Sequence, residues 1–120
     1  MKRIGLLGCG AIGTQIALAI DSGKIPATLT HVYDIERSQA DNLVSKLKQK
    51  PEVVANSHLL SSNSVELVVE AASQEAVRND AVSILQNKKD MMIMSAGALL
   101  DESVFEVISD ACRDLSLIHI

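Results

Sequence analysis

Short apolar runs alternate with amphipathic segments along the chain. The runs are rich in aliphatic and β-branched residues, which is typical of strands that a sheet buries on both faces. In the segments between them, apolar residues recur three or four positions apart, as on the inner face of a helix. The expected strands are 2–7, 28–33, 53–54, 65–69 and 91–94. The expected helices are 11–22, 38–49, 74–87 and 101–113.

Residues that favour turns and helix ends separate these elements. Gly23 follows the first helix, at a position where glycine often ends a helix with positive φ. Pro51 ends the second helix, and Asp101 is an N-cap for the last one. The polar segment 56–64 predicts a turn or a short helix.

Regular alternation of strand and helix builds a parallel sheet. A chain of 120 residues has room for one such domain. We therefore predict an α/β fold, with a doubly wound and mainly parallel sheet that carries helices on both faces.

Composition narrows the classes of partner. The net charge of −4 and the pI of about 5.2 give no basic surface for nucleic acid. With 2% aromatic residues and no Trp, the chain also lacks a platform for stacking bases. Cys9 and Cys112 are too few for a disulfide framework and too far apart for a zinc site, which favours a reducing compartment and no bound metal.

The first residues do not predict a secretory signal or a membrane anchor. Only the short run Ile4 to Leu7 lies between Lys2-Arg3 and the first glycine of the next segment, and a signal needs a run of roughly 7–15 apolar residues. We expect a cytoplasmic protein with no membrane segment.

The last six residues, 115–120 (LSLIHI), are what the mosaic end of a transposase sequencing adapter encodes. We therefore expect native sequence at 1–114, followed by a non-native tail. The alternative is a genuine terminal strand, because the run is apolar.

A glycine motif, Gly8-Cys9-Gly10-Ala11-Ile12-Gly13, joins the first strand to the first helix. In a G-x-G-x-x-G turn the first glycine permits the tight turn and the second lets a pyrophosphate approach the backbone. The third glycine lets the helix pack on the strand, and the helix N-terminus offers amides and a positive dipole to the anion. The motif predicts a Rossmann-type fold that binds a dinucleotide.

Asp34 lies 21 positions after Gly13, at the end of the second strand, where a carboxylate accepts hydrogen bonds from the adenosine ribose. Its charge repels a 2′-phosphate and so favours NAD over NADP, although Arg37 could offset that repulsion. The alternative for Asp34 is a helix N-terminal charge.

Ligands of open α/β sheets bind beyond the carboxyl ends of the strands. Two segments there are candidates, 70–75 (EAASQE) and 95–98 (SAGA). Ser73 either contacts cofactor or caps the next helix, and Gly97 either admits the cofactor or turns the chain. Glu70 is either a buried acid or a charge facing solvent, and the sequence slightly favours solvent.

No catalytic residue follows from the sequence. His31 lies within a strand, His58 lies in a polar segment, and His119 belongs to the suspected tail. Cys9 and Cys112 are expected to pack rather than to react.

Three segments together resemble the L-aspartate dehydrogenase family: the glycine motif 8–13, 68–77 (VVEAASQEAV) and 94–99 (MSAGAL). The resemblance covers residues 2–114 and extends more loosely to the cofactor domain of homoserine dehydrogenases. It implies oxidation of L-aspartate to iminoaspartate with NAD or NADP, a step that feeds NAD biosynthesis. It also implies a homo-oligomer in the full-length enzyme.

The same resemblance implies roles for single residues. Gly10, Ala11 and Ile12 would meet the pyrophosphate, and Asp34 the adenosine ribose. The residues on the nicotinamide side would be Ala71, Ala72, Ser73, Gly97 and Ala98. Family members are about twice as long, and their second half carries the substrate site and a catalytic histidine, so no catalytic residue carries over.

Two other functions remain open at this stage. The chain could be a stand-alone regulatory module that senses NAD and binds a partner protein in place of a catalytic domain. It could also be the cofactor domain of an enzyme like homoserine dehydrogenase or dihydrodipicolinate reductase, because the fold alone does not decide the substrate.

Overall fold

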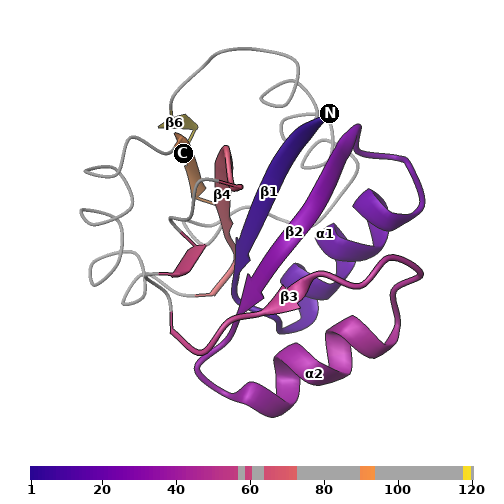
Figure 1. Ribbon diagram of the computed structural model, residues 1–120, viewed down its shortest axis with the longest axis vertical. Coiled ribbons are helices and arrows are strands. Elements are labelled where there is room, and N and C mark those ends of the chain that lie inside the picture. The colour runs from indigo at the N-terminus through magenta and orange to yellow at the C-terminus, as the bar shows by residue number, and fades with distance from the viewer. Residues whose placement is uncertain (57–58, 61–63, 73–89, 94–117, 120) are drawn as a thin grey trace.

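A parallel sheet organises the molecule, as the sequence predicts. The computed structural model describes residues 1–56, 59–60, 64–72, 90–93 and 118–119. Within them a six-stranded sheet has the order β3-β2-β1-β4-β5-β6, and all its pairings are parallel (Figure 1). The strands are β1 (Lys2–Leu7), β2 (Ala27–Tyr33), β3 (Glu52–Val53), β4 (Leu67–Glu70), β5 (Asp90–Ile93) and β6 (Ile118–His119). The helices are α1 (Ala11–Asp21) and α2 (Arg37–Ser45).

Strand order reverses beside β1, since β2 and β3 lie on one side of it and β4 to β6 on the other. This is the order of the Rossmann fold, in which ligands bind where the order reverses. The register places Tyr33, Leu7 and Glu70 in one row at the carboxyl ends of β2, β1 and β4.

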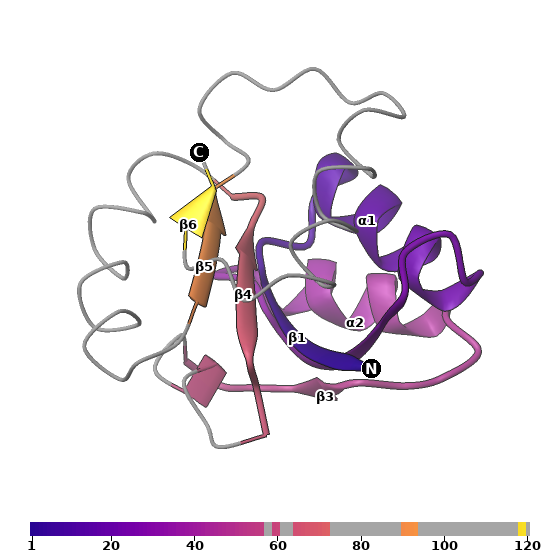
Figure 2. The same ribbon diagram turned by 90° about the horizontal axis from the view of Figure 1, so that it is seen from above.

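Both described helices lie on one side of the sheet (Figure 2). The core on that side joins Ile4 and Leu6 of β1 to Ile16 and Ile20 of α1 and Leu43 of α2. A second cluster on the other side contains Leu7, Leu60, Val65, Val68 and Met91. Side chains of β1 therefore alternate between two cores, as in a strand covered on both faces.

Helix α2 ends at Ser45, four residues before the predicted end at Gln49. The reason is a competing acceptor, because the Asp21 carboxylate receives the amide N–H groups of Lys48 at 3.0 Å and Gln49 at 3.2 Å. The Lys50 ammonium then donates to the carbonyl oxygens of Val44 and Leu47 near the helix end. Hydrogen bonds to Asp21, the last residue of α1, and from Lys50 thus accompany the early end of α2.

Strand β4 begins at Leu67 rather than at the predicted Val65. Just before it, the Glu66 N–H donates to the Arg3 carbonyl at 2.8 Å, but the Arg3 N–H donates to the Glu66 side chain at 3.0 Å. A side-chain acceptor replaces the backbone acceptor there, so the regular ladder starts one step later.

The other predicted elements have mixed outcomes. Strands 2–7 and 28–33 and helix 11–22 are confirmed within one residue, and strands 53–54 and 91–94 are each shifted by one residue. The predicted helices 74–87 and 101–113 lie outside the described residues. Ile118–His119 pairs with Met91 and Met92 as a terminal strand. The proposal that 115–120 is non-native stays a prediction.

Gly13 sets the approach of α1 to β1. A Cβ built on Gly13 would overlap the carbonyl oxygen of Gly8. A Cβ on Gly10 would have only Gln39 Oε1 nearby, at 3.6 Å, which is ordinary contact. The third glycine of the motif is therefore required by packing, whereas the second is not.

We expect Gly13→Ala to lower the free energy of unfolding by about 3 kcal/mol or more, because the methyl group must displace backbone. Gly10→Ala is the matched control and should cost about 1 kcal/mol or less. Urea denaturation of the two variants measures the difference. Equal transition midpoints would show that the contact between α1 and the turn is looser than described.

Candidate dinucleotide-binding site

The turn after β1 is held against both neighbouring strands. Gly8 has a φ of +107°, which L side chains rarely adopt, and its N–H donates to the Tyr33 carbonyl at 2.8 Å. A Cβ on Gly8 would lie 2.7 Å from the Ala72 nitrogen and 2.8 Å from the Ala71 carbonyl carbon. The turn that follows β4 therefore rests directly on the glycine loop.

The N-terminus of α1 opens beside this turn. Gly10 is the N-cap residue, and its carbonyl accepts the Thr14 N–H at 2.9 Å. The first-turn amides of a helix have no carbonyl acceptor within that helix. The first turn (Ala11 to Thr14) contains no acidic side chain, so the positive end of the helix dipole faces outward and suits a phosphate.

Asp34 lies directly after β2 and holds the loop in place. Its Oδ2 accepts the Cys9 N–H at 2.7 Å, and its Oδ1 accepts the Glu36 N–H at 2.8 Å. Each carboxylate oxygen has two lone-pair sites, so one site per oxygen remains for the hydroxyls of a ribose. The same side chain can position the loop and bind a sugar.

Arg37 does not turn toward Asp34. Its Nε donates to Asp41 Oδ1 at 3.2 Å, one turn along α2, and both side chains are more than half exposed. Arg37 is thus engaged with Asp41 on its own helix and makes no hydrogen bond to Asp34.

Cys9 is a buried thiol, 3% exposed, between the loop and β2. Its Sγ lies 3.6 Å from the Tyr33 carbonyl oxygen. Burial, and secondarily the Asp34 charge, raise the pKa of Cys9 to about 12. The thiol is therefore protonated at neutral pH and packs as a small apolar group, as the sequence predicts.

Glu70 contradicts the slight preference for a charge facing solvent. It is 0% exposed at the end of β4, and its Oε2 accepts the Ala72 N–H at 2.7 Å. The available signal was its place at the end of the almost wholly apolar run 65–69, just before two alanines.

A hollow of about 650 Å³ lies between α1 and α2, beside the glycine loop. Sequence reasoning missed its α2 wall, although spacings of three and four residues could have grouped those side chains on one helix face. The α2 wall consists of Gln39, Asn42 and Lys46, and the opposite wall of Cys9, Gly10, Ala11, Thr14 and Gln15.

The structure brings most of the predicted cofactor residues to one edge. Those at the carboxyl ends of β1, β2 and β4 are Gly8, Gly10, Ala11, Ile12, Gly13, Asp34, Ala71 and Ala72. Ser73, Gly97 and Ala98 lie outside the described residues. His31 lies within β2, where its Nδ1 is 2.8 Å from Thr30 Oγ1.

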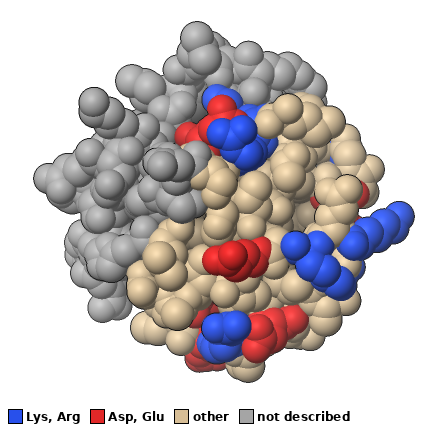
Figure 3. Space-filling view, viewed as in Figure 1, with Lys and Arg blue, Asp and Glu red and all other residues tan. Residues whose placement is uncertain are grey.

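A metal site and a membrane-spanning helix are both absent from the described residues. Among them, no three His, Cys, Asp or Glu side chains gather as a metal site would require. No helix in the same ranges is long and apolar enough to cross a membrane. Acidic and basic side chains are interspersed over the described part of the face in Figure 3.

Comparison with known proteins agrees with this geometry. The family model described as "Homoserine dehydrogenase, NAD binding domain" matches residues 8–116. An L-aspartate dehydrogenase of Nitrosopumilus maritimus is 66% identical over 114 residues, which is 95% of this chain and 42% of that protein. An L-aspartate dehydrogenase of Methanocella arvoryzae is 42% identical over the same shares of the two chains. The chain therefore spans less than half the length of these relatives.

Solved structures agree on the fold. Myo-inositol dehydrogenase from Lactobacillus casei, in complex with NAD(H) and myo-inositol, matches 99% of this chain and 36% of its own, with a TM-score of 0.77. The identity is 16%, so this likeness concerns the fold alone. It confirms the predicted Rossmann-type architecture.

We expect the Cys9 thiol to resist modification in the folded chain. A Cys112→Ser variant leaves Cys9 as the sole thiol, and with a pKa of about 12 only about a thousandth of it is thiolate at pH 9. Labelling by Ellman's reagent at pH 9 should be at least about a hundredfold slower than in urea, since burial also blocks access. Rapid stoichiometric labelling of the folded chain would contradict the burial of Cys9.

The raised pKa of Cys9 also makes the free energy of unfolding depend on pH. Relative to an ordinary thiol of pKa 9.0, the protonated form favours the folded chain, so this contribution is full below pH 9 and is lost as pH rises through 12. A Cys9→Ala variant lacks this loss and serves as the control.

Proposed function

Since this chain belongs to the family of homoserine dehydrogenase NAD-binding domains, we propose that it is the cofactor-binding part of an NAD-dependent L-aspartate dehydrogenase. The 66% identity to an enzyme of that name supports the choice of substrate. Matched relatives are more than twice as long, so we place substrate binding and catalysis in sequence that corresponds to their remaining part. The domain assignment is 1–114 for the cofactor domain, with 115–120 as a non-native tail.

One observation carries the proposal: the ends of β2, β1 and β4 meet at a glycine loop whose surface at Gly10 is open. The nearest atom to a Cβ at Gly10 would be Gln39 Oε1 at 3.6 Å, an ordinary contact, so packing around Cβ does not explain glycine there. Close approach of a phosphate does explain it. The observed geometry therefore fits a dinucleotide.

Each part of the site has a task in this proposal. The amides at Gly10, Ala11 and Ile12 hold the pyrophosphate, and Asp34 holds the adenosine ribose. The small residues that admit the nicotinamide are Ala71, Ala72, Ser73, Gly97 and Ala98. NAD bound there would supply the hydride acceptor for the Cα of L-aspartate, whose amino group would lose a proton as iminoaspartate forms.

We propose NAD rather than NADP as the preferred cofactor. Asp34 presents a fixed carboxylate at the ribose position, and Arg37 is engaged with Asp41 at 3.2 Å. The isolated chain should bind cofactor without turnover, and the full-length enzyme should be a homo-oligomer that takes a small amino-acid substrate.

Calorimetry should show saturable binding of NADH to this chain, and Gly10→Val should abolish it. A Cβ at Gly10 contacts only Gln39 Oε1, at 3.6 Å, and the Val side chain would occupy the space that a phosphate needs. Gly10→Ala should weaken binding by a smaller factor, and urea midpoints confirm that both variants fold. Undiminished affinity in Gly10→Val would refute the cofactor role of the loop.

Asp34→Asn should shift preference toward NADPH, because the amide keeps an acceptor for the ribose and loses the charge that repels a 2′-phosphate. We expect the ratio of NADPH to NADH affinity to rise by about tenfold. Glu66→Gln, which removes a carboxylate beside Arg3 just before β4, is the control and should leave the ratio of the two affinities unchanged. A ratio that is the same in Asp34→Asn and wild type would exclude Asp34 as the selecting residue.

A further inference from the structure

Glu70 is a fully buried carboxylate that cofactor binding, as proposed above, does not use. Among the described residues it is the only charged side chain in the buried class. Removing a carboxylate from water is costly unless hydrogen bonds compensate, so its place in a central strand needs a reason. The hydrogen bond between Glu70 and the Ala72 N–H supplies that reason.

Glu70 fixes the turn that follows β4. Its Oε2 accepts the Ala72 N–H at 2.7 Å, a short bond of the charge-assisted kind. The Ala71 N–H donates to the Leu7 carbonyl at 2.8 Å, which joins the same turn to β1. Ala72 is thereby held where a Cβ on Gly8 would lie 2.7 Å from its nitrogen.

The glycine loop thus has two separate anchors. From β2, the Tyr33 carbonyl accepts the Gly8 N–H at 2.8 Å, and Asp34 accepts the Cys9 N–H at 2.7 Å. From β4, Glu70 holds Ala72 against Gly8. In the proposed site the first anchor lies on the adenosine side and the second on the nicotinamide side.

We propose that Glu70 is a positioning residue for the nicotinamide half of the cofactor and acts through the amide of Ala72. This inference rests on the proposed function. Without the carboxylate, Ala72 loses the hydrogen bond that holds its N–H beside Gly8, while the Ala71 bond to Leu7 and the anchor from β2 remain. The effect falls on the nicotinamide and spares the adenosine diphosphate ribose.

The test compares two ligands on two variants of the whole chain. NADH contains the nicotinamide, and ADP-ribose has the rest of the molecule without it. Glu70→Met keeps the volume and removes the acceptor, whereas Glu70→Gln keeps a neutral acceptor. Calorimetry gives both affinities, and NADH fluorescence reports the surroundings of the nicotinamide.

We expect Glu70→Met to weaken NADH by about tenfold and to change ADP-ribose by less than about twofold. Bound NADH should then emit more like the free cofactor. Glu70→Gln should restore most of the NADH affinity, to within about threefold of wild type, because a neutral acceptor makes a weaker bond. If Glu70→Met does not fold, the ratio of the two affinities in Glu70→Gln decides.

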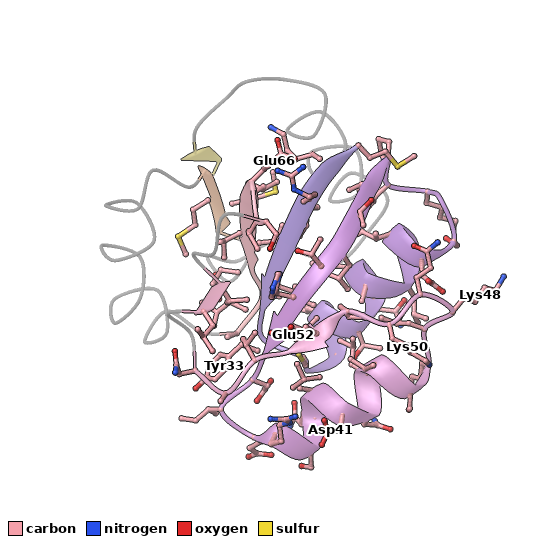
Figure 4. All side chains as sticks on the ribbon, viewed as in Figure 1. Tyr33, Asp41, Lys48, Lys50, Glu52 and Glu66 are labelled. Atoms are coloured by element: carbon pink, nitrogen blue, oxygen red, sulfur yellow. The ribbon has the colours of Figure 1, made fainter. Side chains whose placement is uncertain are left out.

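Glu66 supplies matched controls, since it precedes the same strand and lies at the opposite end of the sheet from Tyr33 (Figure 4). Glu66→Met and Glu66→Gln should leave both affinities unchanged. Equal weakening of NADH and ADP-ribose in the Glu70 variants would overturn the inference, as would no weakening of NADH. A wild-type chain that binds neither ligand would overturn the proposed function itself.

Discussion

The whole arrangement depends on how closely backbone approaches backbone at the turn after β1. Gly13 lets α1 come so near that only a hydrogen fits beside the Gly8 carbonyl, and Gly8 in turn lies against the main chain of Ala71 and Ala72. The start of α1, the turn after β1 and the turn after β4, which is distant in sequence, therefore meet without intervening side chains. A side chain at either glycine would separate the helix, the turn and the neighbouring strand.

Close approach alone does not give a defined loop, because glycine adds freedom as well as room. The carboxylates of Asp34 and Glu70 fix the loop in one conformation by accepting backbone hydrogen bonds. Asp34 binds the Cys9 amide from β2, and Glu70 binds the Ala72 amide from β4, at 2.7 Å in both cases. These bonds fix backbone on both sides of the loop, and in the proposed site the amides at the start of α1 face a phosphate. Preorganisation of this kind lowers the cost of ordering a binding site when its ligand arrives.

The sequence predicts the parts of the site that depend on neighbours in the chain. The spacing of the three glycines and the place of Asp34 after the second strand are local patterns with known geometric meaning. The burial of Glu70 is different, because a charged residue at a strand end is usually exposed. Its surroundings come from segments on both sides of β4, and no local pattern records them. The early end of α2 has the same origin, since Asp21 of another helix captures the amides of Lys48 and Gln49.

By itself, the sequence determined the class of fold, the positions of most described strands and the place of the glycine loop with Asp34 after the next strand. The spacing of the hydrophobic residues and of the glycines encodes those features in short stretches of sequence. Only the tertiary structure decided which backbones touch at Gly8, that Arg37 pairs with Asp41, and that Glu70 is buried and holds Ala72. Arg37 and Asp41 lie four positions apart and Glu70 and Ala72 two, whereas the contacts at Gly8 and the burial of Glu70 depend on the register of parallel strands. That register is set by the packing of the whole sheet and by no single segment of the chain.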